Sequence, residues 1–284
     1  MKNLRFKKLI TSAILAVIAG VFLLSGTGDA EETPESIRQH ISDLESENPD
    51  IAREAANKLL STDKKRSVPL ILEVLKSRET GDLKKCNTIH LLGRMGSEEA
   101  VPELINLLDD KKPIIRKEAI RTLGKIKAKG AIHKLRNIVK SEADPSVLNE
   151  AVRALGDMEA EEAVDDLIEI VQNSYLRRDG YGPVLRESAI EALGKLKSNK
   201  ATALLIDKLT AREDLTIKDK AVWALGEIGA PDSIEALKLY LERLEAIEPT
   251  DKMIHYKWLE SVEITKKAIE KVKNKNQTEE KGAF

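Results

Sequence analysis

Aromatic residues are scarce in this 284-residue sequence, at only 3%, so its core has to be built from aliphatic side chains. Glycine and proline are also infrequent, and a chain rich in Leu, Ile, Val and Ala with few of either favours helices over sheets. The formal net charge is only −1, which gives no global attraction to nucleic acid or to an anionic membrane. We therefore expect an all-α protein that does not bind nucleic acid.

Cysteine is nearly absent too, because Cys86 is the single one in the chain. One cysteine excludes an internal disulfide and a cysteine-based zinc site. The sequence also lacks the HExxH, GxSxG, P-loop, CxxC and GxGxxG motifs, and its four histidines are scattered. We assign no catalytic residue, no metal ligand and no cofactor. The expected state is a monomer, with a dimer linked through Cys86 as an alternative.

The first thirty residues have the three-part layout of a secretory signal peptide. A basic start is followed by an apolar run from Leu9 to Leu24 and then by small residues up to Ala30. The sequence therefore predicts export to the periplasm, the cell envelope or the exterior, with residues 1–30 removed. The alternative is an uncleaved membrane anchor, although the apolar run is shorter than the roughly 20 residues of a bilayer span. Without residues 1–30 the net charge is −4.

Leu-Gly pairs recur along the rest of the chain at intervals of 31, 32, 38 and 32 residues. The pairs begin at Leu92, Leu123, Leu155, Leu193 and Leu225. Twelve residues after each of these leucines stands another leucine: Leu104, Leu135, Leu167, Leu205 and Leu237. A fixed period in this range indicates a stacked helical repeat. The apolar positions fall at offsets of 3, 4, 7 and 8, so each unit should contain two amphipathic helices.

A weaker unit precedes these five, and a helix is expected at each end of the array. Residues 33–247 should form the solenoid, beginning with a short capping helix that Thr33 and Pro34 open. Residues 251–273 should form a C-terminal capping helix, and 274–284 a disordered polar tail. Asn48 and Asp144 are expected to be N-caps. We attribute the glycine of each pair to packing, because the paired helix of the same unit can approach closely where there is no side chain.

The repeat resembles the short HEAT-like repeats, also called PBS-lyase-type HEAT repeats. The run from Pro113 to Ile126 carries the resemblance well, and about 70% of the chain is covered by six such units. The resemblance implies an α-α superhelix of the armadillo and HEAT kind. It also implies that the second helix of each pair lines the concave side.

Two sets of residues are candidates for binding a partner on that surface. Fourteen residues after each of the first four leucines of the pairs, the second helices carry a polar ladder that could hydrogen-bond an extended peptide: Asn106, Asn137, Glu169 and Asp207. The alternative is that these side chains are simply solvated. The 38-residue interval contains an insertion at 173–182 rich in residue types found at binding hot spots: Tyr175, Arg177, Arg178 and Tyr181. The alternative there is a tolerated surface loop.

Trp223 stands at a repeat position that is usually polar, and we expect Trp258 of the C-terminal helix to cover it. The sequence as a whole favours a scaffold that binds a protein or peptide, rather than an enzyme. A divergent HEAT-like enzyme or lyase using carboxylates such as Glu169 and Asp207 is one alternative, and a structural spacer in the envelope is another. The diiron site of the HEAT-like deoxyhypusine hydroxylase needs His-Glu pairs, and no histidine here precedes a glutamate.

Overall fold

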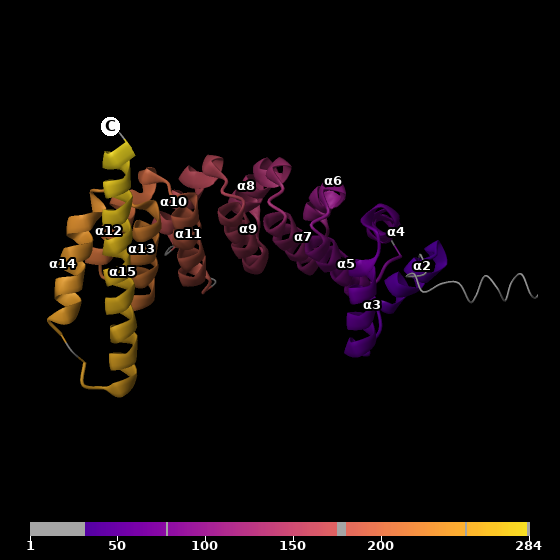
Figure 1. Ribbon diagram of the computed structural model, residues 1–284, viewed down its shortest axis with the longest axis horizontal. Helices are drawn as coiled ribbons and strands as arrows, with labels where there is room; N and C mark the ends of the chain where they lie inside the picture. The colour runs from indigo at the N-terminus through magenta and orange to yellow at the C-terminus, as the bar shows by residue number, and fades with distance from the viewer. Residues whose placement is uncertain (1–31, 78, 175–179, 248, 283–284) are drawn as a thin grey trace, which may run out of the picture.

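The computed structural model describes residues 32–77, 79–174, 180–247 and 249–282, and all regular structure among them is helical. The helices form hairpins stacked side by side into an arch, with α15 at one end and α2 and α3 at the other (Figure 1). The predicted all-α superhelix is therefore confirmed. In the described part of the chain, no helix is both long and apolar enough to cross a membrane.

The helices follow the predicted repeat frame. The N-terminal helix is α2 (Pro34–Asp43). The first helices of the six units are α3 (Pro49–Ser61), α5 (Asp82–Met95), α7 (Pro113–Lys125), α9 (Pro145–Asp157), α11 (Gly182–Leu196) and α13 (Leu215–Ile228). The second helices are α4 (Lys64–Lys76), α6 (Val101–Asn106), α8 (Ile132–Ser141), α10 (Val164–Asn173), α12 (Thr202–Thr210) and α14 (Ser233–Glu245). The last helix is α15 (Lys252–Gly282).

Short 3-10 turns accompany the second helices of the middle units. They are η1 (Glu98–Ala100), η2 (Leu107–Asp109), η3 (Lys129–Ala131), η4 (Glu161–Ala163) and η6 (Asn199–Ala201). Prolines stand in the first turn of several helices, where a missing N–H removes no helical hydrogen bond. The side chains of Asn48 and Asp144 accept hydrogen bonds from the first backbone N–H groups of α3 and α9, as expected for N-caps.

The hydrophobic core runs without interruption along the stack. The recurring leucine of each second helix is completely buried in all five units that carry a Leu-Gly pair: Leu104, Leu135, Leu167, Leu205 and Leu237. One hairpin alone could not cover these side chains, so each unit depends on its neighbours for burial. The exposed fraction of zero at every one of these positions confirms the repeat frame.

The glycine of each Leu-Gly pair faces the first helix of the next unit. A β-carbon built on Gly124 would lie 3.1 Å from Cα of Ala154, and one on Gly156 would lie 2.8 Å from Cα of Ala192. The packing role predicted for these glycines is thus confirmed, but the approaching helix belongs to the next unit rather than to the same hairpin. First helices pack directly on one another along the row, more closely than second helices do.

This difference between the two rows bends the stack. The first helices, which approach one another closely, lie on the inner side of the arch, and α4, α6 and α8 lie on its outer side (Figure 1). The expectation that second helices line the concave side was therefore wrong. The glycines explain the outcome, because the row that can pack more tightly is the shorter one.

The C-terminal helix α15 takes the place of a further first helix. A β-carbon built on Gly226 of α13 would lie 3.0 Å from Cα of Ala268, the relation that links successive first helices. The helix continues to Gly282, so residues 274–282, expected to be a disordered tail, are helical. Near the start of this segment, the Lys275 ammonium donates a hydrogen bond to the Ile228 carbonyl over 2.7 Å, which joins it to the end of α13.

Candidate functional site

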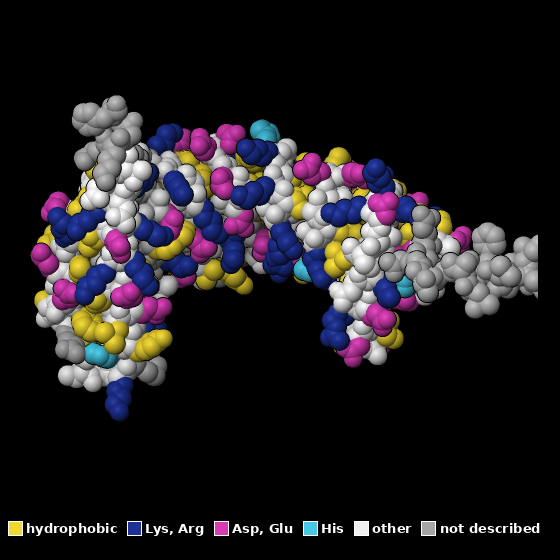
Figure 2. All heavy atoms as spheres, in the orientation of Figure 1, with side chains coloured by type: hydrophobic (Ala, Val, Ile, Leu, Met, Phe, Trp, Pro, Cys, Tyr) yellow, Lys and Arg dark blue, Asp and Glu magenta, His cyan; other side chains and the backbone are white. Residues whose placement is uncertain are grey.

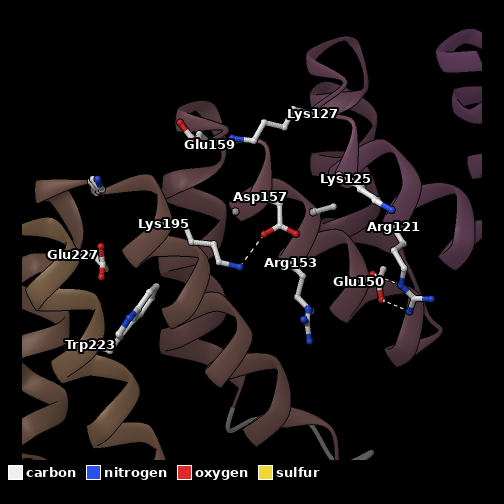
Figure 3. A pocket seen from close by; sticks show the side chains of 14 residues that line it. Arg121, Lys125, Lys127, Glu150, Arg153, Asp157, Glu159, Lys195, Trp223 and Glu227 are labelled. Carbon is white, nitrogen blue, oxygen red and sulfur yellow. Dashed lines mark hydrogen bonds and ion pairs between the residues drawn. The ribbon is translucent and has the colours of Figure 1, made fainter. Parts of the chain in front are cut away.

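A groove of about 640 Å³ lies on the row of first helices, between α7 and α13. Its floor consists of small residues at the helix contacts: Gly124, Ala154 and Gly156. Its walls are long charged side chains, which Figure 3 shows on the first helices of four successive units, α7, α9, α11 and α13. We call it the first-helix groove and define it by its cations (Arg121, Lys125, Lys127, Arg153, Lys195, Lys197), its acids (Glu150, Asp157, Glu159, Glu227) and Trp223.

Every acid of the groove forms an ion pair. Arg121 binds Glu150 through two hydrogen bonds of 3.0 and 2.9 Å. Lys195 and Asp157 are 2.8 Å apart, and Lys127 and Glu159 are 2.7 Å apart, as Figure 3 shows. The fourth acid, Glu227, pairs with Lys271 of α15. These pairs link neighbouring units, and they leave the groove with no carboxylate that lacks a cationic partner.

Three of the six cations, in contrast, form neither a hydrogen bond nor an ion pair through their side chains with any described residue. They are Lys125 on α7, Arg153 on α9 and Lys197 at the end of α11, and all three are exposed. Arg153 lies between Trp223 and the Arg121–Glu150 pair (Figure 3). Lys and Arg side chains also gather along the inner edge of the arch in the space-filling view (Figure 2). The groove is therefore electropositive although the chain as a whole has a formal net charge of −1.

Three charged residues of the groove have an unusual backbone conformation. Lys127, Glu159 and Lys197 have φ angles of 52°, 55° and 52°, in the left-handed region that disfavours side chains by about 1–2 kcal/mol. They follow the ends of α7, α9 and α11. The equivalent residues after α5 and α13 are Gly96 and Gly229, with φ of 62° and 72°. Charged side chains thus replace the favoured glycine in three of the four units that border the groove.

The ion pairs of the groove shift the pKa values of their members. The hydrogen bond from Lys127 lowers the pKa of Glu159, and the hydrogen bond to Glu150 raises the pKa of Arg121. Partial burial acts to lower the pKa of Lys195, but its hydrogen bonds to Asp157 and Glu191 outweigh that effect and raise the value. All three groups stay charged near neutral pH, so the pattern of charges is fixed over the physiological range.

Trp223 forms one end of the groove. Its indole ring covers Gly194, where a β-carbon would lie only 2.6 Å from ring carbon Cζ3. The ring is half-buried, and it separates the first-helix groove from a second depression of about 590 Å³ at the junction of α13 and α15. Trp258 was expected to cover Trp223, but the Trp258 indole instead donates a hydrogen bond to the Leu244 carbonyl over 2.7 Å.

The second depression contains a carboxyl group in an unfavourable setting. Asp219 Oδ2 accepts a hydrogen bond of 2.9 Å from the Ser261 hydroxyl. Its other oxygen, Oδ1, is buried and has no partner among the described residues. Burial, mainly, and the nearby negative charge of Glu260 raise the pKa of Asp219 to about 6. Tyr240 of α14 lies nearby, and its buried hydroxyl also has no described partner.

The predicted ladder of polar residues lies on the other row of helices. Asn106, Asn137, Glu169 and Asp207 are all exposed, at the surfaces of α6, α8, α10 and α12. Glu169 borders a depression of about 360 Å³ between α10 and neighbouring helices. The structure therefore does not bring these residues together with the first-helix groove.

The predicted binding loop lies mostly outside the described residues. Tyr175, Arg177 and Arg178 belong to the segment 175–179, which the structure does not describe. Tyr181 precedes α11 and is 46% exposed. Cys86 on α5 is a free, half-buried thiol, and burial together with nearby acids raises its pKa. No group of three or more His, Cys, Asp or Glu residues able to hold a metal ion occurs in the described part of the chain.

Sequence reasoning missed the first-helix groove, although the sequence contains a signal for it. Polar residues stand two before and two after the leucine of the first four pairs, four residues apart and thus on one face of the first helix. In the third unit these are Arg121 and Lys125, and in the fourth Arg153 and Asp157. The family resemblance placed the concave surface on the second helices, so the residues of this face were not among the predicted binding residues.

Comparisons with known families agree with the repeat frame. The model of the HEAT repeats matches residues 78–147 and 175–245, and the model of the PBS lyase HEAT-like repeat matches residues 147–173. The matched residues include all five Leu-Gly units. No curated protein matches the sequence.

Solved structures with a similar arrangement share little sequence with this chain. YibA of Escherichia coli is 17% identical and has a TM-score of 0.54, over 85% of this chain and 82% of YibA. A chain of the CpcE–CpcF complex of phycocyanin lyase from Nostoc is 21% identical, with a TM-score of 0.45 and coverage of 86% and 97%. Human deoxyhypusine hydroxylase is 18% identical, with a TM-score of 0.37 and coverage of 84% and 86%. At this level of identity, the likeness to YibA shows a shared fold alone.

Proposed function

Since the chain belongs to the family of HEAT-like repeat proteins, we propose that it is an interaction scaffold that binds a partner protein or peptide in the first-helix groove. The observation that carries the proposal is a set of three exposed cations that have no partner among the described residues, in a groove that also contains Trp223 and whose acids are all paired. Arg and Trp are the residue types most enriched at binding hot spots. The left-handed backbone at Lys127, Glu159 and Lys197 supports the proposal, because strained residues are found mostly at functional sites.

We place this scaffold outside the cytoplasm, on the basis of the signal-like residues 1–30. Association with a membrane is proposed only for a form in which that segment is not removed. The loop at 173–182 remains a proposed second contact. A triple alanine variant at Tyr175, Arg177 and Tyr181 should leave stability unchanged and weaken capture of the partner, and unchanged capture would remove the loop from the proposal.

The enzyme alternative receives less support from the geometry. Glu169 and Asp207, its candidate carboxylates, are exposed on separate helices, whereas an acid–base site is typically an enclosed pocket with converging groups. The spacer alternative predicts a surface without preferred contacts. The groove, with cations that no described residue neutralises, favours binding over both.

Site-specific photo-crosslinking in the envelope extract tests the proposal. A crosslinking amino acid at position 153 should capture a defined partner, whereas one at position 137, on the outer row, should not. The partner is then purified, and its affinity is measured for Arg153→Ala and for the control Asn137→Ala. Weaker binding for the first variant alone supports the groove. Equal capture at both positions, or no capture at position 153, would refute it.

A further inference from the structure

The free charges of the groove indicate what kind of partner it accepts. Its four acids are each neutralised by a lysine or arginine, while Lys125, Arg153 and Lys197 have no such partner among the described residues. A basic peptide would find no free carboxylate in the groove. An acidic one would find a free cation on each of three successive units. Building on the proposed function, we propose that the groove binds an extended acidic segment of another protein.

The spacing of the helices sets the spacing of the acids. Packed helices lie about 8–10 Å apart, and an extended chain advances about 3.3 Å per residue. One carboxylate about every third residue would therefore meet successive cations. The distance from α7 to α13 is about three such steps, which corresponds to a segment of about eight residues. The groove thus fits a short acidic peptide in an extended conformation.

Trp223 makes one end of the groove different from the other. Its half-buried ring stands beyond the cations, next to the depression that Leu215 and Ile264 help to line. An apolar side chain at one end of the acidic segment would cover the ring and be partly removed from water. A segment with acids along its length and an apolar residue at one end is therefore favoured over a uniformly acidic one.

Nucleic acid also presents repeated negative charges, but the groove suits it less well. The four acids on the walls would lie against a continuous phosphate backbone, and the chain as a whole is acidic. In an acidic peptide, neutral residues separate the carboxylates. Its carboxylates can therefore contact the free cations while its neutral residues lie against Glu150 and Glu159. The observations therefore favour an acidic peptide, and binding to an oligonucleotide is kept as an outcome of the test.

Fluorescence anisotropy with labelled peptides tests the inference. The probe has about ten residues, with a glutamate at every third position and a terminal leucine. Control probes replace each glutamate by glutamine or lysine. We expect the glutamate peptide to bind at least about tenfold more tightly than either control, and its affinity to fall as salt screens the contacts. Equal affinity for the lysine peptide, or tighter binding of a single-stranded oligonucleotide, would overturn the inference.

A matched pair of variants assigns the binding to the groove. Arg153→Glu should weaken binding of the glutamate peptide at least about tenfold, since it replaces attraction by repulsion. Lys58→Glu makes the same change of charge at the equivalent repeat position of α3, outside the groove, and should have little effect. An equal loss in both variants would overturn the inference, because it would show only a response to net charge.

The outcomes separate this inference from the proposed function. If the partner crosslinked at position 153 binds Arg153→Glu as well as the unmodified chain, and the glutamate peptide does not bind, the scaffold proposal stands and the acidic partner is refuted. If position 153 captures nothing, while the glutamate peptide binds and depends on Arg153, the groove has the inferred chemistry and the scaffold proposal fails.

Discussion

Replacing Gly156 by alanine is the sharpest test of how the stack is held together. Two effects of opposite sign compete at this position. Alanine favours a helix by about 1 kcal/mol relative to glycine. The added β-carbon, however, would lie 2.8 Å from both Cα and Cβ of Ala192, well inside ordinary contact distance. Because the obstacle includes backbone, α9 and α11 have to move apart, and overpacking of this kind costs about 1–3 kcal/mol.

We therefore expect Gly156→Ala to destabilise the fold by about 1 kcal/mol net. Urea unfolding followed by circular dichroism measures the difference. Gly93→Ala should be near neutral, because its β-carbon would meet only the side chain of Thr122, at 3.1 Å. Gly130→Ala, where nothing lies within 4 Å, is the control for the glycine-to-alanine change itself.

Small-angle scattering gives a second measurement on the same variants. If close approach of the first helices bends the arch, Gly156→Ala should open it and raise the radius of gyration, whereas Gly130→Ala should not. A Gly156→Ala protein that is as stable as the unmodified chain, with unchanged dimensions, would refute the explanation of the curvature.

Other expected outcomes concern the core, the groove and the α13–α15 junction. Leu135→Ala should destabilise the fold by about 2–5 kcal/mol in urea unfolding, because the side chain is completely buried, and a neutral result would contradict the repeat frame. Lys197→Gly should stabilise the fold by about 1 kcal/mol by relieving the left-handed backbone, while weakening binding of the glutamate peptide; a loss of stability would contradict the assigned strain. The pKa of Asp219 is raised to about 6, above its unfolded value near 4, so its ionisation destabilises the fold as pH rises through this interval. Asp219→Asn should therefore raise the free energy of unfolding, measured with urea, by about 1 kcal/mol at pH 8 once solvent access is allowed for, but not at pH 3; equal effects at both pH values would point to packing instead.

Much of the fold could be predicted because every unit repeats the same local signals. The buried leucines, the prolines in first turns and the caps at Asn48 and Asp144 each depend on residues close in sequence. The direction of bending could not be predicted in this way. It depends on which row of helices packs more tightly, and thus on contacts such as Gly156 with Ala192, between residues of different units.

The candidate site was harder to predict than the fold for a related reason. Arg121 and Arg153 occupy the same repeat position, but Arg121 is held by Glu150 from the next unit while Arg153 has no described partner. A free cation and a neutralised one look alike in the sequence. The difference arises only when neighbouring units are brought together, so the groove could be located by its repeat positions but not by its charge.

The C-terminal helix determines how long the array can be. On one side α15 presents Ala268 to Gly226, as a further unit would. Two residues after Ala268, where a unit has its glycine, stands the exposed Glu270. A following helix would find a charged side chain at the point where it needs to approach, so α15 can end the series but cannot extend it. The outer face of α15 therefore lacks the close-packing position that links the first helices to one another.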